Sequence, residues 1–378
     1  MKDRIEKNGD RIVVIGPVYP YKGGISHYTG LLVKALKKKY DVCTISYSMQ
    51  YPRILFRKDQ KDHDNDSFKV EDTEYLLNTA LIPNIIKTAG YINSLSPDLV
   101  IVQWWHPYFS PCYNILLKRI RSKILLVCHN VFPHERFPFD RALTSSVMKK
   151  ADFYILHSSK EAEELKSVVP DAKYAVNMHP TYDAFKMEDE TDGQVKESGR
   201  LLFFGFVRPY KGLDVLLEAM RLLPDVVGLD VVGDFADSSM KYRAMIDSYN
   251  LKERVSIREG YVPDREVQKY FSGCDAVVLP YIEATQSGIA QIAYGFGKPV
   301  ISTTAGGLSE VVLDGKTGVL CRPSDPDDLA AAIKRFYELK GSVDFEANIR
   351  EDAGRFSWEH MVETIGKLAG IPGSENDG

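Results

Sequence analysis

The first half of the chain alternates short apolar runs with segments of helical periodicity. Residues 11–16 (RIVVIG) are almost continuously apolar, and apolar side chains then recur every three or four positions from residue 25 to residue 36. Further apolar runs occupy 99–103, 123–128 and 153–157, each followed by a candidate helix. Apolar strands that alternate with helices predict a parallel sheet covered on both faces.

The same alternation returns in the second half after a polar break at 186–199 (KMEDETDGQVKESG). This stretch contains two glycines and no aromatic residue, which is typical of a linker. Strand patterns then follow in order at 201–205, 229–233, 254–259, 275–280 and 299–303. We therefore predict an α/β protein of two doubly wound, Rossmann-like domains that face each other across a cleft. Ligands of such sheets lie outside the carboxyl ends of the strands.

Composition excludes several classes of protein. The 48 Lys and Arg residues against 52 Asp and Glu give a net charge of −4, so no global field favours nucleic acid. The five cysteines are widely spaced and the eight histidines lack metal-ligand spacing, so neither a disulfide framework nor a metal site is expected. No apolar run approaches the roughly 20 residues that span a bilayer. We expect a cytoplasmic protein, soluble or at most peripheral at the inner face of the membrane.

Two strand ends carry residues suited to bind phosphate. The first strand is followed by Gly23 and Gly24, and glycines between a strand and a helix let backbone N–H groups approach an anion. A plain tight turn is an equally good interpretation of that pair. The strand at 201–205 is followed by Arg208 and Lys211, whose cations could hold a diphosphate leaving group. An isolated R-x-x-K is also common in solvated basic turns.

A third strand end, after 275–280, carries the sequence A-T-Q-S-G. Thr285, Gln286, Ser287 and Gly288 precede a helical pattern, where free N–H donors and the helix dipole suit an anion. The alternative is ordinary capping of the helix by Thr285 or Ser287, which would not exclude a site. The same kind of position recurs in both halves of the chain, and this recurrence favours phosphate binding at all three.

The order and spacing of these motifs resemble glycosyltransferase family 4, whose members are retaining enzymes with the GT-B fold. YPYKGGISHYT is similar to the family's glycine loop, FFGFVRPYKGLDVLLEAM to its Arg/Lys phosphate motif, and GKPVISTTAGGLSEVVLDGKTGVL to its C-terminal signature. QWWHPYFSP, CHNVFPHERFPFDR and PYIEATQSG resemble a subgroup with A-T-Q-S-G in place of E-G-F-G. The resemblance covers most of the chain.

Members of this family have two glutamates, spaced E-x(7)-E, that contact the donor sugar and the ribose. Counting from Glu283 gives Gln291 at the second position. Aligning on the family's G-x-P-V, which here ends at Val300, puts the two positions at Ala284 and Ile292 instead. The second alignment needs no gap, so we expect both carboxylates to be absent.

The resemblance assigns further residues to the site. Gly23 and Gly24 would approach the donor, His129 resembles the family's histidine near the sugar, and Val262 lies in the stretch similar to its nucleobase pocket. For a lone histidine at a strand end, a satisfied hydrogen bond in the core is the alternative. Arg208, Lys211 and the turn from Thr285 to Gly288 would hold the diphosphate, and no bound metal or other cofactor is implied.

Acceptor recognition is expected in the first half. Aromatic and basic residues alternate from 46 to 58, and a second aromatic cluster follows at 104–109. Such a mixture suits a glycan or lipid-linked acceptor and could contact a membrane surface. An ordinary loop that packs its aromatic side chains into the domain is an equally good interpretation. The residues we consider for the acceptor are Tyr51, Trp104, Trp105 and His106.

The resemblance also gives each part of the chain a role. It implies an acceptor-side domain at 1–185, the linker at 186–199, a nucleotide-sugar-binding domain at 200–355, a closing helix at 356–370 that crosses back to the first domain, and a flexible tail at 371–378. The implied reaction, of the kind used in polysaccharide biosynthesis, transfers a sugar from a UDP- or GDP-sugar to a glycan, lipid-linked or small-molecule acceptor with retention.

Two other functions stay open. A nucleotide-sugar epimerase on the same fold has a similar phosphate turn to the one at Ser287 and Gly288. A non-catalytic protein that binds sugar nucleotides or glycans would explain the missing glutamates.

Overall fold

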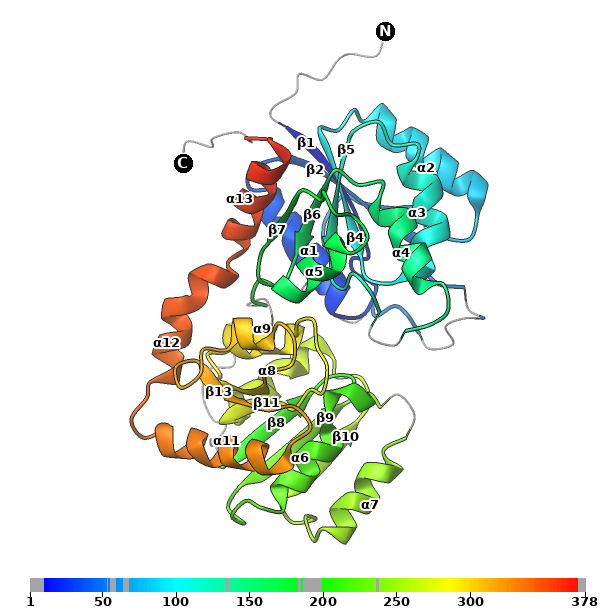
Figure 1. The fold of residues 1–378 in the computed structure, drawn as a ribbon. Helices are drawn as coiled ribbons and strands as arrows, with labels where there is room; N and C mark the ends of the chain where they lie inside the picture. The colour runs from blue at the N-terminus through cyan, green and yellow to red at the C-terminus, as the bar shows by residue number, and fades with distance from the viewer. Residues whose placement is uncertain are drawn as a thin grey trace. The chain divides into compact units, whose positions relative to one another are not determined.

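The computed structural model describes residues 10–52, 54, 59–63, 68–133, 136–182, 185, 199–235 and 238–372. The chain divides into two compact units. Unit 1 comprises Met1–Met178 with Trp358–Gly378, and unit 2 comprises His179–Ser357. Apart from Gly199, the predicted linker lies outside the described residues, as does most of the predicted tail. Each unit contains one parallel sheet with helices on its faces (Figure 1).

The described part of unit 1 has a seven-stranded parallel sheet in the order β3-β2-β1-β4-β5-β6-β7. Its strands are β1 Arg11–Ile15, β2 Asp41–Met49, β3 Thr73–Asn78, β4 Leu99–Trp104, β5 Lys123–Cys128, β6 Phe153–Leu156 and β7 Tyr174–Val176. The order reverses between β1 and β4, which pair directly. Their carboxyl ends therefore flank the crevice where parallel sheets of this kind bind ligands.

Helices cover both faces of this sheet, because alternate strand residues face opposite cores. The elements are α1 Gly24–Leu36, α2 Ile82–Ser94, η1 Pro107–Phe109, α3 Ser110–Leu117, α4 Asp140–Met148, α5 Ser159–Lys166 and α13 Trp358–Ala369. One core joins Val13 and Ile15 to helices α2 to α5. The other joins Ile12 and Val14 to α1 and α13, so the last helix of the chain completes unit 1.

The described part of unit 2 repeats this plan with a six-stranded parallel sheet, in the order β10-β9-β8-β11-β12-β13. The strands are β8 Arg200–Phe204, β9 Gly228–Gly233, β10 Val255–Glu259, β11 Ala276–Leu279, β12 Val300–Thr303 and β13 Gly318–Cys321. The order reverses between β8 and β11, which pair directly. Their carboxyl ends again mark the expected ligand crevice.

The helices of unit 2 follow its strands in sequence. They are η3 Pro209–Lys211, α6 Leu213–Met220, α7 Met240–Ser248, α8 Asp264–Gly273, α9 Gly288–Gly295, α10 Leu308–Val311, α11 Pro326–Leu339, α12 Phe345–Asp352 and η4 Ala353–Phe356. The core of this unit is built from the apolar strands with α6 and α11. In both units, the predicted ligand-binding residues follow the carboxyl ends of strands.

The predicted α/β class and parallel sheets are confirmed, and each apolar run that predicts a strand forms one. Three short strands, β3, β7 and β13, were not predicted from the sequence. β3 reads TEYLLN and is only partly buried at the edge of its sheet, so its sequence resembles a loop. No helix among the described residues has the length and hydropathy needed to cross a membrane.

Candidate active site

The two phosphate-binding loops predicted in unit 2 lie in direct contact. They follow β8 and β11, which are neighbours in the sheet. The backbone N–H of Ile282 donates to the carbonyl of Tyr210 at 2.7 Å. Gly212 has a φ of +65°, and a Cβ atom at this position would lie 2.1 Å from the carbonyl oxygen of Pro280. Glycine is therefore required at 212 both for its backbone conformation and for the approach of the loops.

Lys211 points its ammonium group into this loop contact. The residue is only 9% exposed, and its Nζ lies 5.2 Å from the centre of the Tyr281 ring. Within the described residues, no carboxylate forms an ion pair with it. Burial lowers the pKa of Lys211, and the neighbouring charge of Arg208 lowers this pKa further. A buried cation without an anionic partner is a favourable place for a negatively charged ligand.

The A-T-Q-S-G segment leads into α9, and Ser287 occupies the position that caps this helix. Its side chain makes no capping hydrogen bond, so the capping interpretation does not apply to Ser287. Instead, the Ser287 Oγ lies 3.4 Å from the Tyr281 hydroxyl. Thr285 is buried, and the amide oxygen of Gln286 is buried without a hydrogen-bond partner in the described structure. Tyr281 thus links Lys211 to the start of α9.

Three residues of this region were not predicted from the sequence. Tyr281 lies beneath Lys211, as described above. Tyr182 packs near Gly288 at the first turn of α9, and its hydroxyl lies 3.1 Å from Nε2 of His179. The carbonyl of Pro180 can only accept, so Nδ1 of His179 donates to it at 2.9 Å. A short motif cannot reveal these residues, because Tyr182 and Gly288 are distant in sequence.

The predicted nucleobase residue lies at the same edge of the sheet. Val262 follows β10 and is buried, while the neighbouring Tyr261 is exposed. The backbone N–H of Gly260 donates to the carbonyl of Gly233 at 2.9 Å, which ties this loop to the end of β9. Unit 2 therefore brings together Arg208, Lys211, the A-T-Q-S-G turn and, two strands away, Val262.

The positions aligned with the family's glutamate pair contain no carboxylate. Ala284 and Ile292 are both buried, whereas Glu283 is exposed. Gln291 is also buried, and its side-chain carbonyl oxygen has no hydrogen-bond partner among the described residues. The backbone of Gly306 packs closely against the Ala284 carbonyl, because a Cβ atom added to Gly306 would lie 1.8 Å from that carbonyl oxygen. The loops after β11 and β12 therefore also lie in contact.

In unit 1, the predicted glycine pair opens α1. Gly23 precedes the helix with a φ of +101°, and Gly24 is its first residue. An added Cβ at Gly23 would contact nothing within 4 Å, so the positive φ rather than crowding favours glycine there. This geometry agrees with the tight turn and also leaves room for a ligand beside the backbone.

His129 lies directly after β5 and is 3% exposed. Its Nε2 donates to Oε1 of Gln103 at 2.8 Å, because an amide oxygen can only accept. The rings of Tyr28 and His157 lie beside it, with centroids 4.7 and 5.7 Å away. The core hydrogen bond considered as the alternative for this residue is therefore present.

The four residues proposed for the acceptor differ in their surroundings. For Trp104 the alternative of packing into the domain holds, because it is 0% exposed and donates its indole N–H to the Val131 carbonyl. Trp104 ends a strand buried on both faces, so it belongs to the core. Trp105 and Tyr51 are half-buried and joined by a 3.1 Å hydrogen bond from the indole to the hydroxyl. His106 is half-buried too, which lowers its pKa.

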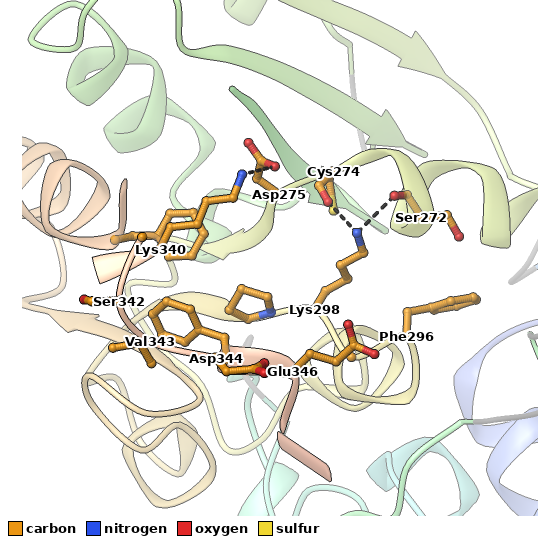
Figure 2. Close-up of a pocket in the computed structure, with 15 residues that line it drawn as sticks. Ser272, Cys274, Asp275, Phe296, Lys298, Lys340, Ser342, Val343, Asp344 and Glu346 are labelled. Atoms are coloured by element: carbon orange, nitrogen blue, oxygen red, sulfur yellow. Dashed lines mark hydrogen bonds and ion pairs between the residues drawn. The ribbon is translucent and has the colours of Figure 1, made fainter. Parts of the chain in front are cut away.

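A cavity of about 770 Å³ lies elsewhere in unit 2, beside the residues that precede β11 and β12 (Figure 2). Figure 2 shows that its lysines are already engaged. Lys298 donates to the carbonyls of Ser272 and Cys274, and Lys340 pairs with Asp275 at 2.5 Å. Since these strands run parallel, the cavity is at the opposite edge from Lys211. We therefore do not assign the candidate site to it.

No group of three or more His, Cys, Asp or Glu side chains in the described part of the chain is arranged to hold a metal ion.

Comparison with known proteins gives a match over much of unit 2. Residues 198–338 match the family model for Glycosyl transferases group 1. The matched segment of this glycosyltransferase family runs from before β8 to near the end of α11 and includes both loops around Lys211. The sequence resemblance to glycosyltransferases is thus confirmed at the level of this broad family.

Two relatives show how far the similarity extends. A D-inositol 3-phosphate glycosyltransferase of Geodermatophilus obscurus is 28% identical over 295 residues, which are 73% of this chain and 63% of that protein. A GDP-mannose:glycolipid 4-beta-D-mannosyltransferase of Xanthomonas campestris is 37% identical over 106 residues, 28% of this chain and 30% of that protein. The chain therefore spans less than two thirds of the length of either relative.

Similarity to solved structures covers nearly the whole chain. Anabaena Alr3699/HepE, solved in complex with UDP and glucose, aligns with a TM-score of 0.74 at 17% identity. The alignment covers 96% of this chain and 99% of that protein. At this identity the similarity concerns the fold alone. The predicted GT-B fold of two Rossmann-like domains is confirmed.

Proposed function

We propose that this protein is a glycosyltransferase that moves a sugar from a nucleoside diphosphate sugar to an acceptor with retention of the anomeric configuration. The observation that carries the proposal is the buried Lys211 ammonium at the contact of two loops, without a carboxylate partner in the described structure. This lysine lies within the segment that matches the group 1 glycosyltransferases.

In this reaction, Lys211, Arg208 and the first turn of α9 would stabilise the departing diphosphate. When the bond from the anomeric carbon to the diphosphate breaks, its electron pair stays on the phosphate oxygen, and negative charge accumulates there. Lys211 and Arg208 supply two positive charges at this point. The first turn of α9 adds backbone N–H groups and the positive end of a helix dipole. Preorganised charges of this kind stabilise the transition state more than the ground state.

The donor would be a UDP- or GDP-sugar, and its base would lie near Val262. The Anabaena protein that shares the fold was solved with UDP and glucose, and the Xanthomonas relative is named for GDP-mannose. The missing glutamates leave the sugar and ribose to other groups. Gln286 has a buried carbonyl oxygen that a hydroxyl of the donor could satisfy.

The acceptor would be a glycan or a lipid-linked sugar that unit 1 recognises. Trp105, Tyr51 and His106 remain candidates for this role because they are half-buried and lie together through the Trp105 to Tyr51 hydrogen bond. Trp104 is removed from the set by its burial. The proposal places the protein in the cytoplasm, with its acceptor at the inner face of the membrane.

The test is a transfer assay with UDP- and GDP-sugars over a panel of glycan and glycolipid acceptors. We expect acceptor-dependent release of the nucleoside diphosphate, and an NMR spectrum of the product should show the anomeric configuration of the donor. Conversion of the donor without any acceptor would favour the epimerase alternative instead. Tight nucleotide binding with no release over the whole panel would favour a binding protein.

A further inference from the structure

Tyr281 is a buried aromatic residue between the two loops of the candidate donor site. It lies just after β11 and is only 3% exposed. Its carbonyl oxygen accepts from the Thr303 hydroxyl at 2.6 Å, and the next residue, Ile282, donates its backbone N–H to the Tyr210 carbonyl. The backbone of Tyr281 is therefore tied to the end of β12 on one side and to the loop after β8 on the other.

The face of the Tyr281 ring lies against the Lys211 ammonium. Nζ is 5.2 Å from the ring centre, within the range in which an aromatic face attracts a cation. A Cβ atom added to Gly205 would lie 3.7 Å from the same Nζ and 3.3 Å from Cδ1 of Ile289, so the ammonium lies beside the end of β8 and near the first turn of α9. Within the described residues, no carboxylate forms an ion pair with Lys211. The ring therefore supplies the attraction that a carboxylate would supply elsewhere.

An aromatic face holds a cation without neutralising it. Burial lowers the pKa of Lys211, and the neighbouring charge of Arg208 lowers this pKa further. A carboxylate beside the ammonium would offset this cost, but it would also repel an incoming diphosphate. The ring stabilises the ammonium through its quadrupole and has no net charge, so the positive charge stays available to an anion.

The hydroxyl of Tyr281 makes a weaker contact. It lies 3.4 Å from the Ser287 Oγ, whereas an ordinary O–H···O hydrogen bond spans roughly 2.5–3.0 Å. Burial raises the pKa of Tyr281 to about 12, so the phenol stays protonated near neutral pH and adds no negative charge. We therefore expect the ring, more than the hydroxyl, to affect the charge at Lys211.

We propose that Tyr281 is a positioning residue of the donor site, whose ring holds the Lys211 ammonium between the two loops and leaves it available to the diphosphate of the donor. The inference rests on the proposed function, because the diphosphate is the group that this ammonium would meet. Tyr281 acts through Lys211 and need not touch the donor. A residue that only fills the core would show no such dependence on Lys211.

Two substitutions separate the ring from the hydroxyl. Tyr281→Phe keeps the ring and should lower the affinity for UDP or GDP, whichever binds the wild type, by less than about threefold. Tyr281→Leu removes the ring and should lower that affinity about tenfold or more. Tyr281→Met fills more of the same space without a ring and should give the same loss as Tyr281→Leu. Titration calorimetry of each folded variant measures these affinities.

The titration of Lys211 gives a readout that core packing does not predict. In protein with isotopically labelled lysine, the Cε resonance that disappears in Lys211→Met reports the protonation of Lys211 as pH is varied. An aromatic face favours the charged form, so the pKa of Lys211 should fall further in Tyr281→Leu and stay near the wild-type value in Tyr281→Phe. An unchanged or higher pKa in Tyr281→Leu would overturn the inference.

A double-mutant cycle tests whether Tyr281 acts through Lys211. Once Lys211→Met has removed the charge, adding Tyr281→Leu should lower nucleotide affinity by no more than about threefold, as Tyr281→Phe does in the wild type. Losses that multiply as independent effects would overturn the positioning role and assign Tyr281 to core packing.

The matched control is Tyr242→Leu in the same unit. Lys241 Nζ lies 5.4 Å from the centre of the buried Tyr242 ring, but this lysine is 61% exposed and pairs with Asp214 at 2.8 Å. Tyr242→Leu should cost stability and leave nucleotide affinity unchanged. Equal losses of affinity in Tyr242→Leu and Tyr281→Leu would overturn the inference.

Binding and transfer together separate this inference from the proposed function. Nucleotide binding that depends on the Tyr281 ring through Lys211, with no transfer to any acceptor by the wild type, would reject the proposed function and leave the positioning role. Wild-type binding and transfer in Tyr281→Leu would reject only the positioning role.

Discussion

The carboxyl edges of the two sheets use the same architecture for different kinds of site. In unit 2, the edge beside β8 and β11 holds Lys211, a buried cation that has no carboxylate partner in the described structure. In unit 1, some buried polar groups at this edge bond to one another, while the amide nitrogen of Gln103 and the hydroxyl of Ser26 are buried without a hydrogen-bond partner among the described residues, and neither group carries a charge. His129 donates to Gln103, and the hydroxyls of Tyr47 and Tyr113 lie 2.5 Å apart.

This difference indicates where a ligand supplies what the protein lacks. A buried neutral polar group gains much less from an anionic ligand than an uncompensated buried positive charge does. Unit 2 is therefore the part of the molecule where binding a diphosphate would release free energy. Among its described residues, the corresponding edge of unit 1 offers no buried cation of this kind. Its half-exposed aromatic residues Trp105 and Tyr51 suit contact with a neutral ligand better.

The largest expected effect is that of removing the Lys211 charge. Lys211→Met should lower the transfer rate by about 10²–10³-fold, since it removes a preorganised charge from the leaving group. The matched control is Lys298→Met in the same unit, whose lysine donates to the Ser272 and Cys274 carbonyls. That control should cost stability and leave transfer nearly unchanged. Equal losses of transfer in the two variants would contradict a specific role of Lys211 in stabilising the leaving group.

Lys211→Met should also change stability in the opposite direction to activity. Burial lowers the pKa of Lys211, so carrying the positive charge costs the folded state free energy, and this cost is fully present at pH values below the folded-state pKa. Methionine avoids this cost, and we expect unit 2 to gain about 0.5–2 kcal/mol, as other substitutions that trade function for stability do. Thermal unfolding of the wild type and variant near neutral pH measures the difference. A less stable variant would indicate that the ammonium is well compensated in the free protein.

The next largest effect is expected from separating the two loops. Gly212→Ala places a Cβ 2.1 Å from the Pro280 carbonyl oxygen, at a φ of +65°. We expect a loss of at least about 2 kcal/mol in unit 2, because backbone strain and displacement of the loop add. Gly341→Ala is a suitable control, since a Cβ there would contact nothing within 4 Å. Chemical denaturation monitored by circular dichroism compares the two.

The A-T-Q-S-G turn provides a more modest comparison. Ser287→Ala removes a hydroxyl at the start of α9 and should lower transfer about tenfold, the value of one hydrogen bond to a charged group. Glu283→Ala removes an exposed carboxylate nearby and should change transfer less than about twofold. The reverse order in steady-state kinetics would restore Glu283 as the donor-binding residue.

A further expected effect concerns the stability of unit 1 and its buried titratable groups. Burial raises the pKa of Glu161 to about 8, while burial lowers that of His157 to about 4. Between about pH 4.5 and 6.5 these two groups change stability in opposite directions. From about pH 6.5 to 8 only Glu161 acts: the folded state holds a proton that the unfolded state releases, so stability falls by up to about 1.4 kcal/mol per pH unit.

Glu161→Gln should flatten this decline and stabilise unit 1 at pH 8. The measurement is tryptophan fluorescence during denaturation at several pH values. All three tryptophans of the chain, Trp104, Trp105 and Trp358, lie in unit 1, so their emission follows that unit. An unchanged decline in the variant would assign the pH dependence to other groups.

Much of the fold could be predicted from the sequence because buried parallel strands are continuous apolar runs. Strands such as β4 and β11 are buried along their whole length, so their pattern is unambiguous. β3 and β7 are partly exposed at the edges of their sheets, so local pattern alone does not identify them. Their pairing with a neighbouring strand depends on the whole sheet.

The site was predicted in part for a similar reason. Arg208, Lys211 and the turn at Ser287 were predicted because each follows a recognisable strand. Tyr281 and Tyr182 were missed, since their roles depend on what lies against Lys211 and Gly288 in three dimensions. Trp104 was misassigned because sequence does not say which residue of a Trp pair ends the buried strand.

The most direct test of the account is calorimetric binding of UDP and GDP to the wild type, Lys211→Met and Lys298→Met. We expect one nucleoside diphosphate to bind the wild type and Lys298→Met with similar affinity, and its affinity for Lys211→Met to be about tenfold or more lower. The corresponding monophosphate should lose less in Lys211→Met, because it lacks the β-phosphate. Equal affinity of Lys211→Met and the wild type for both diphosphates would contradict the assignment of the donor site to Lys211.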